Sequence, residues 1–331
     1  MDLTVIWAFV IAFAVGFYVI ADGFDLGIGL LFPRFPVGPE RDAAMNAIAP
    51  VWDGNETWLV LGGGGLMAAF PLAYAIVLPA LYAPIVAMLL GLIFRGVAFE
   101  FRWRDPAHRR AWDFGFTAGS FVAAFAQGVT LGALLQGIAV ADRAYAGGWW
   151  DWLTPFSLLT GASLCVGYAL LGAGWLIAKT EGETRAIARR AGRPLLALFL
   201  LALATVSLAT PFLEGQYWQR WFVSPGLFVT VPMPLLVAAL AALLWRSLGH
   251  DNDAHPFFYA LGLFGLTLVG LGISIWPDVI PGRVTIWEAA APHSSQSFML
   301  IGAIITVPLI LAYTGWSYWV FRGKVGGEGY H

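Results

Sequence analysis

Long apolar segments alternate with short polar connections along the whole chain. A helix needs roughly 20 mostly apolar residues to cross a hydrocarbon core of about 30 Å. We predict nine spans, at residues 3–32, 47–70, 73–101, 112–137, 156–178, 194–212, 225–245, 257–277 and 297–321. The longest connections, 138–155 and 278–296, are too short to fold around a core of their own. The pattern therefore predicts an all-α, multi-pass transmembrane bundle that forms a single membrane domain over residues 1–331.

The first two segments are less regular than the others. The first has no positively charged region before it and contains Asp22 and Asp25, so we interpret it as a span and not as a signal peptide. The second opens with the polar string Trp52-Asp53-Gly54-Asn55-Glu56-Thr57. Both segments therefore carry polar groups where an ordinary span is apolar.

Basic residues orient the predicted spans. Of the 18 Lys and Arg residues, fourteen fall after spans one, three, five and seven or in the C-terminal tail. Three fall on the opposite side (Arg143, Arg220 and Arg283), and Arg95 lies inside the third span. Short cytoplasmic loops accumulate Lys and Arg. We therefore expect the N-terminus outside and the C-terminus inside.

Composition narrows the class of protein further. The chain is 59% hydrophobic and 11% charged, whereas soluble domains carry about 25% charged residues. The net charge of −2 leaves no basic face outside the loops, which argues against nucleic acid as a partner. The single cysteine, Cys165, excludes an intrachain disulfide and a thiolate metal cluster. We expect a membrane protein surrounded by lipid.

Six ionisable side chains within the predicted spans stand out as the strongest candidates for function. They are Asp22, Asp25, Asp53, Glu56, Arg95 and Glu100. An intramembrane charge costs at least a few kcal/mol unless it is paired or hydrated. Because one arginine cannot pair with five acids, the remaining carboxylates need donors, water or a proton. This combination is typical of a proton relay.

Two structural alternatives stay open for these acids. Asp22, Asp25 and Glu100 lie toward the inner ends of their spans, where they could pair with Arg102 or Arg104. Asp53 and Glu56 follow Pro50, and acids favour the first turn of a helix. In both cases the carboxylates would stabilise helix ends or the membrane boundary. Gln127 and Gln136 in the fourth span are interpreted as amide bridges between helices.

Histidine is missing from the interior of every predicted span. The five histidines lie in loops, at span edges or in the tail: His108, His250, His255, His293 and His331. A haem in a helical bundle is normally held by a His or Met that projects from a span. We therefore expect this chain to bind neither haem nor metal, and we interpret its intramembrane methionines as packing residues.

Three polar motifs, in order, resemble those of subunit II of the cytochrome bd-type quinol oxidases. The motifs are Asp22-Gly23-Phe24-Asp25-Leu26-Gly27, Ile48-Ala49-Pro50-Val51-Trp52-Asp53-Gly54-Asn55-Glu56 and Phe94-Arg95-Gly96-Val97-Ala98-Phe99-Glu100-Phe101-Arg102. A weaker likeness continues through Leu134-Leu135-Gln136-Gly137, Trp287-Glu288, Ser295-Gln296 and Tyr313-Thr314-Gly315-Trp316. The compact loops are similar to those of the cyanide-insensitive branch.

The resemblance implies a subunit of a respiratory enzyme in the bacterial cytoplasmic (inner) membrane. A haem-bearing subunit I, with b- and d-type haems, would oxidise quinol, reduce oxygen to water and generate a proton gradient. A small single-span accessory subunit often joins the two. The active centre would lie in the partner, so no catalytic residue is expected in this chain.

The resemblance also implies roles for individual residues. Asp53 and Glu100 would line a proton path toward the haems. Asp22, Asp25 and Glu56 are assigned to the same path because they are intramembrane acids, not because of the resemblance. A structural quinone would lie near Trp52, Asp25 and Arg95. This sequence has Glu100 where the family commonly has Asp, and Gly96 where Pro often follows the arginine.

Two other functions account for the same charges. A proton-coupled secondary transporter also shows intramembrane acids and Gly-interrupted helices, and it would be active alone in liposomes. A purely structural scaffold would keep its turnover when Asp53 and Glu100 lose their charge.

Overall fold

The computed structural model describes residues 2–250 and 252–325 and consists almost entirely of helices. The helices are α1 (Leu3–Leu31), α2 (Pro39–Asn46), α3 (Trp52–Ala69), α4 (Pro71–Ala80), α5 (Tyr82–Arg104), α6 (Arg109–Leu135), α7 (Pro155–Lys179), α8 (Gly182–Ala209), α9 (Gly215–Phe222), α10 (Leu227–Thr230), α11 (Pro232–Ser247), α12 (His255–Ile275), α13 (Ile286–Ala289) and α14 (His293–Val320). The predicted all-α membrane bundle is confirmed.

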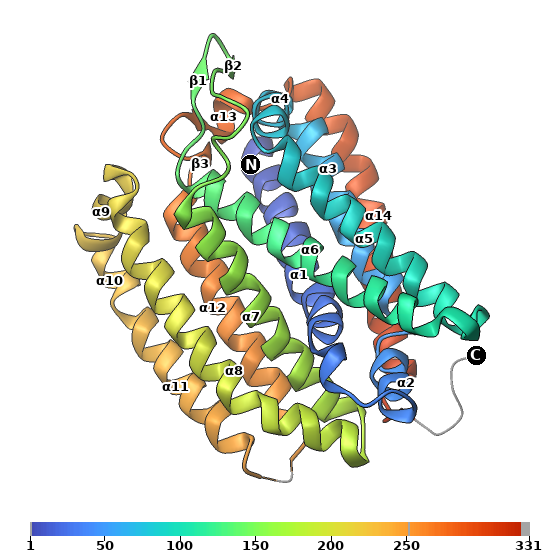
Figure 1. Ribbon diagram of the computed structural model, residues 1–331. Coiled ribbons are helices and arrows are strands. Elements are labelled where there is room, and N and C mark those ends of the chain that lie inside the picture. The colour runs from blue at the N-terminus through green and yellow to red at the C-terminus, as the bar shows by residue number, and fades with distance from the viewer. Residues whose placement is uncertain (1, 251, 326–331) are drawn as a thin grey trace.

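Two antiparallel hairpins occupy the longest connections. They are β1 (Val140–Ala141) with β2 (Ala144–Tyr145), and β3 (Asp278–Ile280) with β4 (Val284–Thr285). Both lie at the same end of the bundle as the N-terminus (Figure 1). Three short 3-10 turns, at Phe32–Arg34, Pro106–His108 and Thr210–Phe212, adjoin longer helices.

By length and hydropathy, the described residues give fewer candidate spans than the nine predicted. Seven helices of the described residues meet both criteria, or up to eight if α3 and α4 are one span. The chain bends by 119° between α3 and α4 because Phe70 ends one helix and Pro71 starts the next. The seventh predicted segment, 225–245, is shortened at Pro232 and leaves α11 with 16 residues.

Glycines let the central helices approach one another closely. A Cβ on Gly27 of α1 would lie 1.8 Å from the backbone oxygen of Tyr168 on α7. A Cβ on Gly119 of α6 would lie 2.6 Å from the backbone oxygen of Gly91 on α5. Small residues at such crossings allow backbone contact within a membrane. These crossings bring the polar residues of α1 and α5 into one interior.

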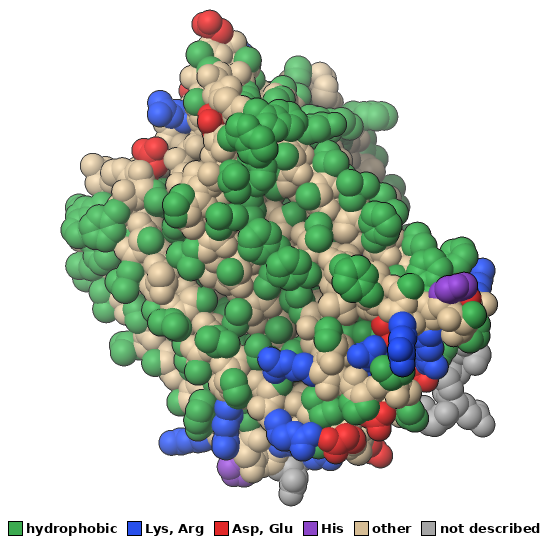
Figure 2. Space-filling view, in the orientation of Figure 1, with side chains coloured by type: hydrophobic (Ala, Val, Ile, Leu, Met, Phe, Trp, Pro, Cys, Tyr) green, Lys and Arg blue, Asp and Glu red, His purple; other side chains and the backbone are tan. Residues whose placement is uncertain are grey.

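The two ends of the bundle differ in charge. Figure 2 shows Lys and Arg side chains gathered at the lower end, where Figure 1 places α2. Few basic side chains appear at the opposite end in this view, and the middle of the surface is predominantly apolar. This distribution follows the loop charges expected from the sequence.

Candidate functional site

Arg95 lies at the centre of a buried ion cluster that joins three helices. Its guanidinium extends from α5, and its side chain is 1% exposed. Nη1 donates to Oε1 of Glu56 on α3 at 2.7 Å and to Oδ1 of Asp22 on α1 at 3.2 Å. Nη2 lies 3.9 Å from Oδ2 of Asp25, one turn after Asp22. The cluster therefore holds more negative than positive side chains.

Asn55 and Tyr318 connect this cluster to the last helix. Asn55 Nδ2 donates to Oδ2 of Asp25 at 2.7 Å and to the Ala21 carbonyl at 3.2 Å. The Tyr318 hydroxyl donates to Asn55 Oδ1 at 2.8 Å. Sequence reasoning missed both residues. Asn55 could have been found from the polar string that contains it. Tyr318 lies at the end of an apolar segment, where no sequence feature indicates a polar contact.

A cleft of about 220 Å³ opens beside the cluster. It is lined by Ala49, Pro50, Val51, Trp52, Asp53, Gly54, Asn55, Phe99, Glu100, Tyr313, Thr314, Ser317 and Tyr318. Asp53 and Glu100, the two acids predicted for a proton path, thus share one cleft although they come from α3 and α5. Its wall is formed by aromatic rings, peptide groups and carboxylates.

The three residues predicted for a quinone site also lie close together. The guanidinium carbon of Arg95 is 5.7 Å from the centroid of the Trp52 ring, and Trp52 packs on Phe99 at 5.1 Å. Trp52 lines the cleft, whereas Asp25 and Arg95 lie behind it in the interior.

The structure shows which of the expected partners each acid has. Asp22 and Asp25 pair with Arg95 and are fully buried, so they are not boundary pairs with Arg102 or Arg104. Glu100 does lie 3.8 Å from Arg104, but the two side chains are 44% and 75% exposed. A pair this exposed contributes little to stability. Asp53 is in the first turn of α3 without capping it.

Gln127 bridges helices as expected, and two tyrosines extend the bridge. Its Nε2 donates to the Tyr18 hydroxyl at 2.6 Å, and the Tyr168 hydroxyl donates to its Oε1 at 2.7 Å. Tyr18 lies one helical turn before Asp22 on α1, so the bridge borders the ion cluster. Gln136 accepts a hydrogen bond from the Thr154 hydroxyl.

A second ion cluster, which was not predicted from the sequence, lies at the end of the bundle where Lys and Arg side chains gather. Arg102 is buried, with Nε 2.5 Å from Oδ1 of Asp113 and Nη1 2.8 Å from Oδ1 of Asp42. Arg41 donates to the other oxygen of Asp113 at 2.7 Å, and Arg109 also pairs with Asp42. These contacts fix α2 against α5 and α6. The partners are too far apart in sequence for spacing to reveal them.

The described part of the chain contains no group of three or more His, Cys, Asp or Glu side chains arranged to hold a metal ion. His108 pairs with Asp105 at 2.9 Å and is largely exposed. The three carboxylates that do converge surround the guanidinium of Arg95. The geometry of this site is therefore that of an ion-paired cluster.

Comparison with known proteins gives a consistent assignment. Residues 3–321 match the family described as cytochrome bd terminal oxidase subunit II. The chain is 32% identical to the cytochrome bd-I ubiquinol oxidase subunit 2 of Escherichia coli K12, covering 97% of this chain and 94% of the relative. It is 29% identical to the cytochrome bd ubiquinol oxidase subunit 2 of Bacillus subtilis, covering 94% and 93%.

A solved structure supports the same fold. A chain of the bd oxidase from Geobacillus thermodenitrificans superposes with a TM-score of 0.80 at 16% identity, covering 97% of this chain and 98% of that one. The function predicted from the three motifs is confirmed, and the transporter alternative finds no support. This multi-pass membrane protein belongs to the cytochrome bd terminal oxidase subunit II family.

Proposed function

We propose that this chain is the haem-free subunit of a quinol-oxidising, oxygen-reducing complex, in which a haem-bearing subunit I carries b- and d-type haems. The relatives from Escherichia coli and Bacillus subtilis are ubiquinol oxidase subunits, which makes a quinol the expected reductant. The observation that carries the proposal is the buried Arg95 cluster beside a cleft that contains Asp53 and Glu100. Such a site has the groups for moving protons but no haem ligand of its own.

The proton path that we propose runs inward from the cleft. Asp53 is exposed and Glu56, three residues later on the same face of α3, is 28% exposed. Glu56 bonds to Arg95, which in turn contacts the fully buried Asp22 and Asp25. Exposure thus falls step by step from the cleft to the interior. Glu100 supplies a further carboxylate on the opposite wall of the cleft.

The same cleft is our proposed site for a structural quinone. A quinone ring needs a flat apolar surface and polar groups at its two carbonyls. Trp52, Phe99 and Tyr318 supply aromatic surface, and Arg95 lies behind Trp52. The Tyr313 hydroxyl and the Thr314 side chain are polar groups in the same wall.

We propose that subunit I docks on the face formed by α3, α5 and α14. Large apolar side chains project from this face, including Val60, Phe94, Ile305 and Leu309, each at least 64% exposed. Lipid would cover such residues equally well. However, Asp53 and Glu100 lie on the same face, and a carboxylate is costly against hydrocarbon. A protein partner accounts for both the apolar and the charged groups.

Orientation and assembly complete the proposal. The Arg-rich end faces the cytoplasm, so the N-terminus is outside and the C-terminus inside, as the loop charges indicate. Residues 1–331 form one membrane domain. A small single-span accessory subunit joins the complex, and the compact loops favour the cyanide-insensitive branch.

The test uses the tagged chain purified with its partner in mild detergent. We expect haem absorbance bands, a second multi-span protein and quinol-driven oxygen uptake. Asp53→Asn and Glu100→Gln should lower the uptake while haem content stays constant. Asp151→Asn, in the exposed loop before α7, is the matched control and should have no effect. Unchanged uptake in both cleft variants would favour a pure scaffold, and a colourless, partner-free chain would contradict the proposal.

A further inference from the structure

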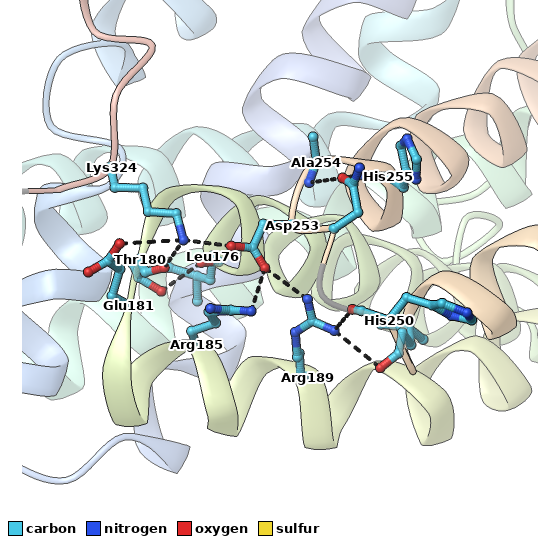
Figure 3. Close-up of polar contacts among 12 residues, drawn as sticks. Leu176, Thr180, Glu181, Arg185, Arg189, His250, Asp253, Ala254, His255 and Lys324 are labelled. Carbon is cyan, nitrogen blue, oxygen red and sulfur yellow. Dashed lines mark hydrogen bonds and ion pairs between the residues drawn. The ribbon is translucent and has the colours of Figure 1, made fainter.

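The Arg-rich end of α8 carries more positive charge than its neighbours neutralise. Arg185, Arg189 and Arg193 recur every four residues and therefore share one face of the helix. Asp253, in the loop between α11 and α12, lies 2.8 Å from both Arg185 and Arg189. Its other oxygen is 2.6 Å from Nζ of Lys324 (Figure 3). One carboxylate is thus shared by three cations.

The third arginine of this row, Arg193, forms no ion pair with a carboxylate of the described residues. Arg193 is exposed, and its guanidinium carbon lies 5.3 Å from the centroid of the Trp245 ring on α11. Arg246, the next residue of α11, is also exposed. Within residues 2–250 and 252–325, neither guanidinium has a carboxylate within 4.0 Å. In the part of the chain that the structure describes, two cations without an ion pair therefore lie beside an aromatic ring at the end of the bundle.

Apolar surface continues from these arginines along both helices. The exposed leucines are Leu198, Leu201 and Leu208 on α8, and Leu235, Leu236 and Leu243 on α11. At 1.5 Å per residue, Leu235 lies about 16 Å from Arg246 along α11. This distance is half of a hydrocarbon core of about 30 Å, which is the depth of one acyl layer. Tryptophan is itself enriched at the boundary between headgroups and hydrocarbon.

We propose that Arg193 and Arg246 bind the phosphate of an anionic phospholipid whose acyl chains lie along the exposed leucines of α8 and α11. Guanidinium groups pair with phosphate through two parallel hydrogen bonds. A zwitterionic lipid would bring its own cation to a surface that already has excess positive charge. The inference needs the membrane location of the chain, but neither the proton path nor the quinone site.

The binding test uses the intact oxidase complex, stripped of lipid in mild detergent. Native mass spectrometry follows titration with phosphatidylglycerol or with phosphatidylcholine of the same acyl chains. We expect one tight site for phosphatidylglycerol, weakened about tenfold, or about 1.4 kcal/mol, in the double variant R193Q/R246Q. The control R34Q/R110Q removes two other exposed arginines and should leave the tight site unchanged.

Several outcomes would overturn the proposal. These are equal affinity for the two lipids, a tight site that survives in R193Q/R246Q, or an equal loss in the control. Displacement of the lipid by millimolar inorganic phosphate would mean a free phosphate site. If the double variant fails to assemble, brominated acyl chains give a second readout in the wild-type complex. Brominated phosphatidylglycerol should quench the Trp245 emission, defined by comparison with W245F, more than brominated phosphatidylcholine, and equal quenching would refute the site.

Discussion

Arg95 Nη1 lies 2.7 Å from Glu56 Oε1, and this ion pair joins a fully buried cluster to a partly exposed residue next to Asn55, which lines the cleft. Arg95 is 1% exposed, whereas Glu56 retains 28% of its side-chain exposure. Behind the pair lie Asp22 and Asp25, which have no exposure at all. In the proposed proton path, Glu56 therefore connects the interior carboxylates with Asp53 in the cleft.

Replacing Glu56 tests this connection. Glu56→Gln keeps a hydrogen-bond acceptor for Arg95 but cannot release a proton, so we expect quinol-driven oxygen uptake to fall at least about tenfold. Glu56→Asp should restore part of it. Haem content measures assembly in each case. Glu183→Gln, at an exposed pair with Arg190, is the control and should leave uptake unchanged. Full activity of Glu56→Gln would remove Glu56 from the path.

Removing the Arg95 charge should destabilise the fold. Arg95→Gln leaves Asp22 and Asp25 buried without a cation, which costs about 3–5 kcal/mol when one partner of a buried pair is lost. We expect a lower thermal midpoint and less assembled complex. Arg104→Gln removes the same charge from an exposed pair and should cost at most about 1 kcal/mol. Equal losses in the two variants would show that the cluster is not stabilised by Arg95.

The hydrogen bonds of Asn55 predict stability losses of different size for two variants. Tyr318→Phe removes one hydroxyl donor and should cost about 1 kcal/mol. Asn55→Leu leaves the Asp25 carboxylate and the Ala21 carbonyl without their donor and should cost about 2–3 kcal/mol. Thermal unfolding of the purified complex measures both. The order of the two losses is the critical result, and the reverse order would contradict the assigned contacts.

Close packing of α1 on α7 predicts a strong effect of one methyl group. Gly27→Ala would place Cβ 1.8 Å from the Tyr168 carbonyl oxygen, so the helices must separate. Overpacking of this kind typically costs about 1–3 kcal/mol or more. Gly272→Ala on α12 meets no atom within 4 Å and should be tolerated. Detergent stability of the two variants checks the prediction. A stable Gly27→Ala would mean that the two helices are further apart.

We expect the segments around Asp253 to become less ordered at acidic pH. Burial opposes ionisation, but hydrogen bonds from Lys324 and Arg189 outweigh it and hold the pKa of Asp253 below its ordinary value. Because the folded-state pKa is lowered, the stabilisation is complete above the unfolded value of about 3.9 and disappears as the pH falls through the folded-state pKa.

Hydrogen exchange of residues 248–250, 252–254 and 321–325, corrected for intrinsic rates, measures this effect. We expect protection at about pH 6 that falls toward pH 3, and no such fall in Asp253→Asn, which should already be less protected at pH 6. The same pH dependence in wild type and variant would refute the role of Asp253.

The sequence by itself determined the helical segments, the charge asymmetry of the two ends and the identity of the intramembrane charges. Apolar runs interrupted by Pro and charged residues mark where a chain can leave the membrane. The three motifs also determined the family. Asp53, Glu56 and Arg95 could be chosen in advance because an ionisable group inside an apolar segment is conspicuous without any knowledge of its neighbours.

The tertiary structure decided which of these groups meet. Hydropathy indicates how deep a residue lies in the membrane, but it does not indicate which helix faces it. Arg95 could have paired with any of five acids, and the tertiary packing of α1, α3 and α5 brings Asp22, Asp25 and Glu56 to it. The contact of Tyr318 with Asn55 likewise joins segments distant in sequence. The angle of the bend at Pro71 and the shortened α11 also became visible only in the structure.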